Sequence, residues 1–567
     1  MSYDARPWLA SYPADVPTDF EFPQVPLTRL LDDAASSFPA GVALATSGTT
    51  FTYRRLRELV DRFAGGLSSL GVTTGDRVAL VLPNCPQHVV AFFAVLRLGA
   101  TVVQCNPLST EAELAEQLAD CSPSVVVCLD KTIATVEKVR AQVGIRQVVV
   151  ASLADYLPAA TRVRLRLPLP AARAQRARLM ADVPASEGIV RFTAVADHKR
   201  PAQQAPIDPA TAVAVLQYTG GTTGASKAAK LSHANLVANS YQMRLWLPEA
   251  MSGRETTLAV LPLFHVYGLT LCLLTTVLLA GRLVLLPRFD LDLVFDAIDE
   301  ERPTLFPGVP PIYQALLDAP RLRRTDLHSI RACISGAMKL PIDVQERFER
   351  VTGGRLVEGY GTTETSPATH CQPLSGPRPA GSVGLPLPGT DARIVDPDDP
   401  TREIPVGEPG ELAVRGPQVF LGYWSNDGEE QPLLDDGWLL TGDIATMDEA
   451  GFFSIVDRKK DLVIAGGFNI YPAEVEAVIR SHESVADCCV IGLPDRYRGE
   501  TVKAFVVPRP GAVLQESDVI EHCSTRLSAY KVPKMVELRD DLPRTAIGKA
   551  LRRLLVAEEL AKRETTQ

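Results

Sequence analysis

The sequence predicts an α/β fold: a large N-terminal domain with two mainly parallel sheets flanked by helices plus a small β-rich subdomain, and a small mobile α+β C-terminal domain. Three observations support this prediction. Continuous apolar runs suited to buried strands alternate with helical patterns over most of the chain, which is typical of parallel sheets. Short strands and turns replace the alternation after about residue 390, and a compact mixture of helices and strands begins near residue 461.

Residues 78–104 show the alternation most clearly. The run that begins at Val78 is continuously apolar, as expected for a strand covered on both faces. Apolar side chains at three- and four-residue spacings predict a helix over Pro86–Leu98, which Gly99 ends before a second strand starts at Ala100. Further strands are predicted at 124–129, 147–151, 212–217, 258–261, 282–286, 332–335 and 355–357.

The run from Leu258 to Ala280 is long and apolar enough to resemble a membrane span. It contains Pro262, His265 and Gly268, however, which a spanning helix would not be expected to combine. A strand, a turn and a buried helix therefore explain the run better.

The segment Leu157–Ala181 interrupts the alternation of strands and helices. It holds six arginines and no acidic residue. The simpler interpretation is a solvated surface insertion with a positive face. The alternative is a basic amphipathic segment that lies on an anionic membrane surface.

The later part of the chain divides into smaller units. Short strands are predicted at 391–395, 410–415, 437–442 and 451–456. The tail is expected to hold helices near 472–480 and 516–527 and strands at 485–492 and 503–507. We therefore expect an N-terminal domain over 1–456 with subdomains at about 1–210, 211–385 and 386–456, a hinge at 457–460 and a mobile domain over 461–567.

The composition is that of a globular protein. The 567 residues are 46% hydrophobic and 22% charged, and the net charge of -9 argues against general nucleic-acid binding. The ten cysteines form neither a CxxC pair nor a zinc-finger spacing, which indicates reduced, buried thiols. The N-terminal residues lack an apolar signal-peptide core. A cytoplasmic location is expected. Peripheral contact with the inner face of the membrane is an additional hypothesis.

The sharpest local feature is Tyr218-Thr-Gly-Gly-Thr-Thr-Gly-Ala-Ser-Lys227. Its glycines let backbone amides approach a phosphate closely, and its hydroxyls and lysine add donors and a positive charge. It is not a Walker A loop, because Ser226 stands directly before the lysine where that loop requires glycine. A structural glycine-rich hairpin is the alternative. The phosphate-binding interpretation names Thr219, Gly220, Gly221, Thr222, Thr223, Gly224 and Lys227.

With this loop the chain resembles the AMP-forming adenylating enzymes, which include acyl-CoA synthetases, firefly luciferase and peptide-synthetase adenylation domains. It most resembles bacterial long-chain fatty acyl-CoA synthetases, with motifs in matching order from about Arg6 to Arg553. The resemblance implies an acid-thiol ligase that uses ATP, Mg²⁺ and coenzyme A. Its substrate would be a small-molecule carboxylic acid, expected to be a medium- to long-chain fatty acid. The acid would pass through an acyl-adenylate, with release of AMP and pyrophosphate.

A second signature, Glu358-Gly-Tyr-Gly-Thr-Thr-Glu364, resembles the family's adenine and metal motif. The resemblance implies that Tyr360 stacks on adenine, Thr363 contacts phosphate and Glu364 holds Mg²⁺. These roles suit the side chains, because an aromatic face fits a purine and a carboxylate fits a hard divalent cation. The glycines of the motif, Gly359 and Gly361, are assigned to the same nucleotide site.

Three further motifs complete the catalytic machinery that the resemblance implies. Asp443 would accept hydrogen bonds from the ribose hydroxyls, and Arg458 would contact the ribose. Lys460 would be the pivot between the two domains. Lys549 would reach the acid's carboxylate and the α-phosphate, where a cation offsets the repulsion of two anions.

The remaining assignments line the acyl and coenzyme A sites. By resemblance, His265 lies near the substrate carboxylate as a second catalytic residue, while Gly336 and Ala337 lie beside the adenine and the acyl group. The thin pantetheine chain would pass a loop formed by Gly466, Gly467 and Phe468.

Other functions stay open at this stage. A fatty-acyl-AMP ligase that loads a carrier protein and a ligase for aryl or other acids share these motifs. A degenerate nucleotide-binding scaffold is the non-enzymatic alternative, and the presence of Lys549, Glu364, Asp443 and Arg458 argues against it. The resemblance also makes a homodimer an expected assembly, although no residue pattern indicates one.

Overall fold

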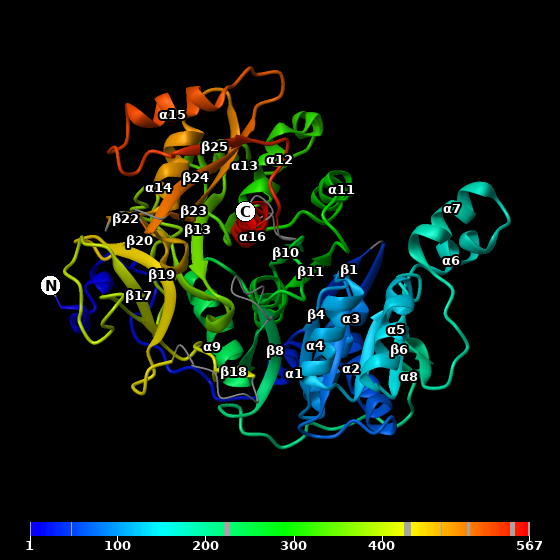
Figure 1. The fold of residues 1–567 in the computed structure, drawn as a ribbon. Helices are drawn as coiled ribbons and strands as arrows, with labels where there is room; N and C mark the ends of the chain where they lie inside the picture. Colours follow the sequence, from blue (N-terminus) through cyan, green and yellow to red (C-terminus); the bar gives the residue numbers. More distant parts are fainter. Residues whose placement is uncertain are drawn as a thin grey trace.

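The computed structural model describes residues 2–46, 48–219, 227–424, 433–465, 468–495, 499–544 and 550–564. Within these ranges the chain forms several sheets flanked by helices (Figure 1), which confirms the predicted α/β class. All ten cysteines are buried and free, as their apolar surroundings predict.

An eight-stranded sheet organises the N-terminal part, in the order β18-β9-β8-β4-β3-β5-β6-β7. The six strands from β8 to β7 are parallel, while β9 and β18 run antiparallel at one end. The strands are β3 (Arg77–Val81), β4 (Thr101–Cys105), β5 (Val125–Leu129), β6 (Gln147–Ala151), β7 (Ile189–Arg191), β8 (Val213–Thr219), β9 (Lys227–Ser232) and β18 (Tyr423–Trp424). The crossover helices α3 (Pro86–Arg97), α4 (Glu111–Cys121) and α5 (Ile133–Val143) confirm the βαβ pattern.

A second group of strands is also partly parallel. β10, β11 and β1 pair in parallel, as do β12 and β13, and Leu305 bridges the two groups through Thr257 and Ala332. The antiparallel neighbours β2, β14 and β15 lie at the margins. The bounds are β1 (Val42–Thr46), β2 (Thr49–Thr52), β10 (Thr256–Ala259), β11 (Arg282–Leu285), β12 (Ala332–Ser335), β13 (Arg355–Gly361), β14 (Ala368–Cys371) and β15 (Leu385–Pro386).

Helices cover these sheets. α2 packs against α3 and α8, and α9 packs against the π-helix η4. The bounds are α1 (Thr28–Ser37), α2 (Tyr53–Ser69), α8 (Phe192–Ala196), α9 (His233–Trp246), α11 (Leu291–Glu301), α12 (Pro310–Asp318) and α13 (Ile342–Thr352).

The apolar run over 258–280 folds as predicted. β10 ends at Ala259, a turn follows, and the buried π-helix η4 (Gly268–Leu274) continues into α10 (Thr275–Leu278). None of the helices in the described ranges combines the length and the apolar character that a membrane crossing requires.

Two smaller units follow. An antiparallel sheet contains β16 (Asp391–Val395), β17 (Gly410–Arg415), β19 (Leu439–Met447) and β20 (Phe453–Arg458). The C-terminal unit, orange to red in Figure 1, has its own apolar core. It contains β21 (Val463–Ala465), β22 (Phe468–Ile470), β23 (Val485–Asp495), β24 (Gly499–Pro508), β25 (Met535–Leu538), α14 (Pro472–Arg480), α15 (Glu516–Ser524) and α16 (Arg552–Glu564).

The arginine-rich segment forms two short helices, α6 (Ala159–Arg166) and α7 (Pro170–Leu179), between β6 and β7. They stand apart from the sheets at one side of the molecule (Figure 1). The segment is therefore an insertion between two neighbouring strands of the large sheet, and the choice between a solvated and a membrane-facing surface stays a prediction.

One buried carboxyl on β13 makes the stability of the fold depend on pH. Glu358 is 6% exposed, and its Oε2 accepts a hydrogen bond from the Leu340 amide over 3.1 Å. Burial raises the pKa of Glu358 to about 7, and the Leu340 amide and Lys339 offset only part of this effect. The side chain is therefore partly protonated at neutral pH.

We expect Glu358→Gln to stabilise the fold increasingly as the pH rises. A carboxyl whose pKa is raised by folding contributes stability below its unfolded pKa and loses that contribution as the pH rises through its folded pKa. Glutamine keeps an acceptor for Leu340 without the charge. Between pH 5 and pH 8.5 the variant should gain about 2 kcal/mol in unfolding free energy relative to the wild type. Urea unfolding at both pH values measures this, and a difference that is independent of pH would contradict the assignment.

Candidate functional site

The two ends of the predicted phosphate loop lie next to each other. Thr219 ends β8 and Lys227 begins β9, and the two residues pair across the antiparallel hairpin. Because β8 belongs to the parallel strands, Thr219 lies at the carboxyl edge of the large sheet, where ligands bind in open α/β folds. Outside the described residues lie the predicted phosphate-binding positions Gly220, Gly221, Thr222, Thr223 and Gly224.

Asp443 is the centre of a polar cluster built from three strands. It is 3% exposed in β19. The Tyr360 hydroxyl from β13 donates to Asp443 Oδ2 over 2.6 Å, and Arg458 Nε from β20 lies 3.0 Å from Asp443 Oδ1. Asp443 and Arg458 are paired positions of β19 and β20, so the register of the small sheet sets the ion pair. Residues from three separate sequence motifs thus meet at one carboxylate.

The charge of Arg458 is maintained by surrounding acids. Burial alone would lower its pKa, but Asp443, Asp461 and Glu364 raise it, and the pKa of Arg458 lies above its ordinary value. Glu364 is therefore within electrostatic range of the cluster around Asp443. The side chain comes from η6 (Thr363–Thr365), the short turn that follows β13 and also carries Thr363.

Glu364 contacts a tyrosine that sequence reasoning missed. Tyr423 in β18 donates from Oη to Glu364 Oε1 over 2.6 Å. β18 pairs with β9, and Lys227 Nζ lies 5.6 Å from the centroid of the Tyr423 ring. Tyr423 therefore connects the predicted metal ligand to the lysine of the phosphate loop. A strand of two residues carries no periodicity from which its place could be predicted.

Close packing explains why the predicted site contains glycines. A Cβ atom at Gly361 would lie 1.8 Å from the carbonyl oxygen of Pro367, and one at Gly336 would lie 3.0 Å from Tyr267 Cζ. A Cβ atom at Gly359 would lie 3.1 Å from Cγ2 of Ile334, which is closer than most real Cβ contacts. Ala337, which follows Gly336, has a φ of 65°, a left-handed conformation uncommon outside glycine.

His265 lies just before the π-helix. Its carbonyl oxygen accepts a hydrogen bond from the Leu269 amide over 2.8 Å, and its ring centroid lies 4.8 Å from that of Phe264. Gln217 on β8 donates to the Phe264 carbonyl over 3.0 Å, which holds this segment at the carboxyl edge of the large sheet. Burial lowers the pKa of His265 to about 4, so its imidazole is neutral at physiological pH. A neutral imidazole can still donate one hydrogen bond to a carboxylate.

The predicted hinge and coenzyme A residues lie beyond β20. Lys460 is exposed in η7 (Lys459–Asp461), and the backbone of Phe468 begins β22 opposite Ala465. Asp457 accepts a hydrogen bond from the Ala473 amide over 2.7 Å, which ties the end of β20 to α14. Outside the described residues lie Gly466, Gly467 and Lys549.

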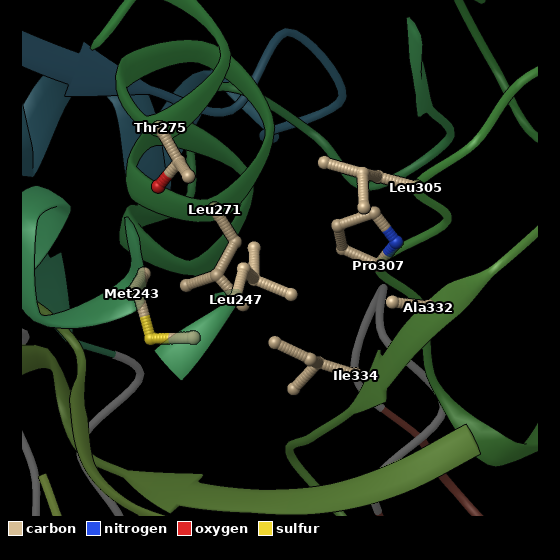
Figure 2. Close-up of a pocket in the computed structure, with 8 residues that line it drawn as sticks. All are labelled: Met243, Leu247, Leu271, Thr275, Leu305, Pro307, Ala332 and Ile334. Carbon is tan, nitrogen blue, oxygen red and sulfur yellow. The ribbon is translucent and has the colours of Figure 1, made fainter. Parts of the chain in front are cut away.

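An apolar cavity of about 20 Å³ lies between α9 and β12 (Figure 2). Its walls come from α9, the π-helix with α10, the stretch around Leu305 and β12. The lining residues are Met243, Leu247, Leu271, Thr275, Leu305, Pro307, Ala332 and Ile334. The space fits about one water molecule, so a longer apolar ligand would require side chains to move. Met243 is suited to such movement, because its unbranched side chain adapts easily.

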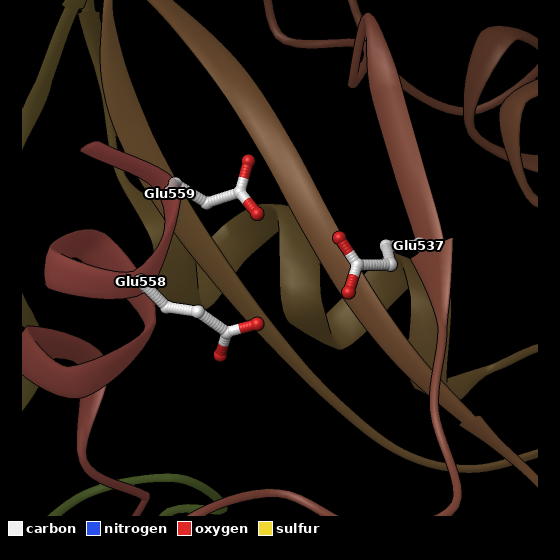
Figure 3. A group of neighbouring side chains, drawn as sticks. All are labelled: Glu537, Glu558 and Glu559. Carbon is white, nitrogen blue, oxygen red and sulfur yellow. The ribbon is translucent and has the colours of Figure 1, made fainter. Parts of the chain in front are cut away.

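One group of three carboxylates in the described residues lies close enough to hold a metal ion: Glu537, Glu558 and Glu559 (Figure 3). Positive side chains already neutralise it. Lys503 Nζ lies 2.7 Å from both Glu537 and Glu559, and Lys562 Nζ lies 2.8 Å from Glu559. We assign this network to the attachment of α16 to the C-terminal sheet.

Comparison with known families and proteins places these features in context. The family described as AMP-binding enzyme matches residues 31–424, and the family described as AMP-binding enzyme C-terminal domain matches residues 474–549. A protein named long-chain-fatty-acid--CoA ligase from Bacillus subtilis (strain 168) is 44% identical over 556 residues, which cover 98% of each chain.

Solved structures share the fold as well. ATP-bound MatB from Rhodopseudomonas palustris superimposes with a TM-score of 0.79 and 32% identity, over 94% of this chain and 98% of that one. The anthranilate CoA ligase AuaEII in complex with anthranoyl-AMP gives a TM-score of 0.80 and 26% identity, over 98% and 99% of the two chains.

If Glu364 holds the metal as predicted, Tyr423→Phe should weaken binding of Mg²⁺-ATP by roughly tenfold, because a hydrogen bond that orients a metal-binding carboxylate contributes about this much to metal affinity. The variant keeps the ring beside Lys227 and loses only the hydroxyl that contacts Glu364. Calorimetric titration of ATP over a series of Mg²⁺ concentrations measures the effect. Tyr241→Phe is the control, since it removes a hydroxyl from a tyrosine that stacks on Phe20 instead. Identical Mg²⁺ dependence in the wild type and Tyr423→Phe would refute a positioning role.

Proposed function

The chain belongs to the AMP-binding enzyme family, and from this premise we propose that it joins a medium- to long-chain fatty acid to coenzyme A at the expense of ATP. The reaction passes through an acyl-adenylate and releases AMP and pyrophosphate. The observation that carries the proposal is the meeting of Tyr360, Asp443 and Arg458 in one cluster. These side chains come from distant parts of the chain and provide an aromatic ring, an acceptor and a cation for a nucleotide.

In the first half-reaction, the acid's carboxylate attacks the α-phosphorus of ATP and pyrophosphate leaves. Asp443 accepts hydrogen bonds from the ribose, and the Tyr360 ring lies against adenine. Glu364 would hold Mg²⁺, which would neutralise phosphate charge there. Its carboxylate fits that role, because it is half-buried and is oriented by the hydroxyl of Tyr423. Positioning and charge neutralisation supply most of the catalysis.

In the second half-reaction, the thiol of coenzyme A attacks the acyl carbonyl and AMP leaves. We propose that the domain over 461–567 rotates about Lys460 between the two steps. Lys549 then withdraws, and the loop of Gly466 and Gly467 with Phe468 enters to form the pantetheine tunnel. The exposure of Lys460 in a short turn between two separately packed sheets supports a pivot there.

The acyl chain is proposed to extend from His265 toward the apolar cavity in Figure 2. The π-helix connects the two places, since it begins three residues after His265 and carries Leu271 into the cavity wall. The apolar lining favours an acid with a hydrophobic chain over one whose chain carries charged groups. The anthranilate CoA ligase among the structural neighbours makes an aryl acid the second candidate.

We expect Lys549→Ala to reduce acyl-adenylate formation by at least about 100-fold, because it removes a cation from the transition state. Thioester formation from supplied acyl-AMP should be largely spared, since Lys549 has withdrawn by that step. Single-turnover assays of each half-reaction measure both rates, with Lys534→Ala as an exposed-lysine control. Equal losses in the two half-reactions would remove the assigned role.

The substrate class is tested by pyrophosphate release with a panel of acids, each with and without coenzyme A. We expect turnover with C12–C18 acids, little with acetate, and thioester only when coenzyme A is present. A preference for benzoate-type acids would establish the aryl alternative. Release without thioester would indicate a carrier-loading ligase, and a failure of every acid to cause release would contradict the proposed reaction.

A further inference from the structure

The two helices of the insertion between β6 and β7 expose a row of positive charges. Arg162, Arg164 and Arg166 on α6 and Arg173 on α7 are all exposed. No hydrogen bond or ion pair within the described residues involves their guanidinium groups. Arginines elsewhere in the chain are often paired; Arg140, for example, contacts Glu137 over 3.0 Å. We call these four arginines, together with Val163, Leu167 and Leu169, the arginine surface.

The apolar residues of the arginine surface also face solvent. Val163 is 61% exposed, Leu167 42% and Leu169 54%. Other apolar residues are buried on the inward side of the helix pair, where Leu165 is 2% exposed and Ala172 is 5% exposed. The exposed leucines and valine are therefore not needed to hold α6 against α7. Apolar side chains interleaved with arginines are the composition of segments that lie in a membrane interface.

The location of the arginine surface relates it to the catalytic site. α6 follows β6, whose carboxyl end lies at the same edge of the large sheet as that of β8, because all strands between them are parallel. The turn that follows β5 also reaches α7, because Lys131 Nζ donates to the Ala177 carbonyl over 3.0 Å. The same edge carries Thr219, where the phosphate loop begins, and Phe264, which Gln217 holds in place.

We propose that the arginine surface docks the protein on an anionic lipid bilayer. The arginines bind lipid phosphates, and Val163, Leu167 and Leu169 enter the boundary between headgroups and acyl chains. Because the surface shares an edge with the catalytic site, docking turns that edge toward the lipid, from which an amphiphilic acid could be drawn. The inference adds a partner to the proposed reaction and does not depend on which acid is activated.

Two features favour lipid over other anionic partners. The net charge of the chain is -9, but residues 157–181 hold six arginines and no acidic residue. Because salt screens charges over about 10 Å, this positive segment attracts an anionic surface only when that surface is close to it. Nucleic-acid binding would use the arginines but would leave three large apolar side chains in water. A bilayer accommodates both kinds of residue, because arginines are attracted to an anionic surface while apolar side chains enter the headgroup boundary.

The test is co-sedimentation of the full-length protein with sucrose-loaded vesicles. One set contains phosphatidylcholine alone and the other contains phosphatidylcholine with about a third phosphatidylglycerol. We expect binding to the anionic set that falls steeply as salt is raised. Replacement of Arg162, Arg164, Arg166 and Arg173 with Gln should weaken partitioning at least about tenfold. The matched control replaces four exposed arginines elsewhere, namely Arg54, Arg254, Arg323 and Arg324, with Gln.

A second measurement reports insertion directly. The indole fluorescence that Val163→Trp introduces should be quenched by brominated lipids in anionic vesicles, and pyrophosphate release with a medium-chain acid supplied in solution should be unchanged in all variants. The proposal is overturned if the two quadruple variants partition equally. It is also overturned if the wild type binds neutral and anionic vesicles alike, or if bromine leaves the fluorescence of Val163→Trp unchanged. None of these binding readouts requires turnover, so failure of the proposed reaction would be seen separately.

Discussion

The carboxylate of Asp443 constrains the candidate site more than any other group. A buried charge without partners is costly, so the Tyr360 hydroxyl and the Arg458 guanidinium must stay within hydrogen-bonding distance of it. Tyr360 belongs to β13 and Arg458 to β20, so this one interaction joins the second group of strands to the small antiparallel sheet. Glu364 follows β13 and Lys460 follows β20, so the interaction at Asp443 also fixes where these two residues lie.

The direction of the parallel strands supplies the other constraint. The six parallel strands of the large sheet end at one edge, and that edge carries Thr219, the segment that Gln217 holds and the helices of the arginine surface. This arrangement depends only on the direction of the strands and not on any particular residue inside the sheet. The proposed nucleotide site and the proposed lipid-facing surface therefore lie on the same side of the molecule.

Sequence patterns were sufficient for the elements whose side chains repeat with a clear period. Five strands of the large sheet (β3, β4, β5, β6 and β8), the helix at Pro86–Arg97 and the buried run around the π-helix were predicted close to their observed bounds, whereas β7, β9 and β18 were not predicted. The motif residues Tyr360, Asp443 and Arg458 were also named. Their contact was not predicted, because the sequence of one strand does not show which distant strand it lies beside. Tyr423 was missed for the same reason: its function depends on Glu364, 59 residues away. The domain boundaries and the roles assigned to the site residues, Gly220 and Lys549 among them, stay predictions.

The central claim is that Asp443 binds the ribose of a nucleotide. Calorimetric titration of AMP and of 2′,3′-dideoxy-AMP against the wild type and Asp443→Asn tests it most directly. The account predicts that the wild type binds AMP at least about tenfold more tightly than the dideoxy analogue, since two hydroxyls donate to one buried carboxylate. In Asp443→Asn that preference should largely disappear. A wild type that binds both nucleotides equally, or a variant that keeps the full preference, would contradict the assignment of the cluster.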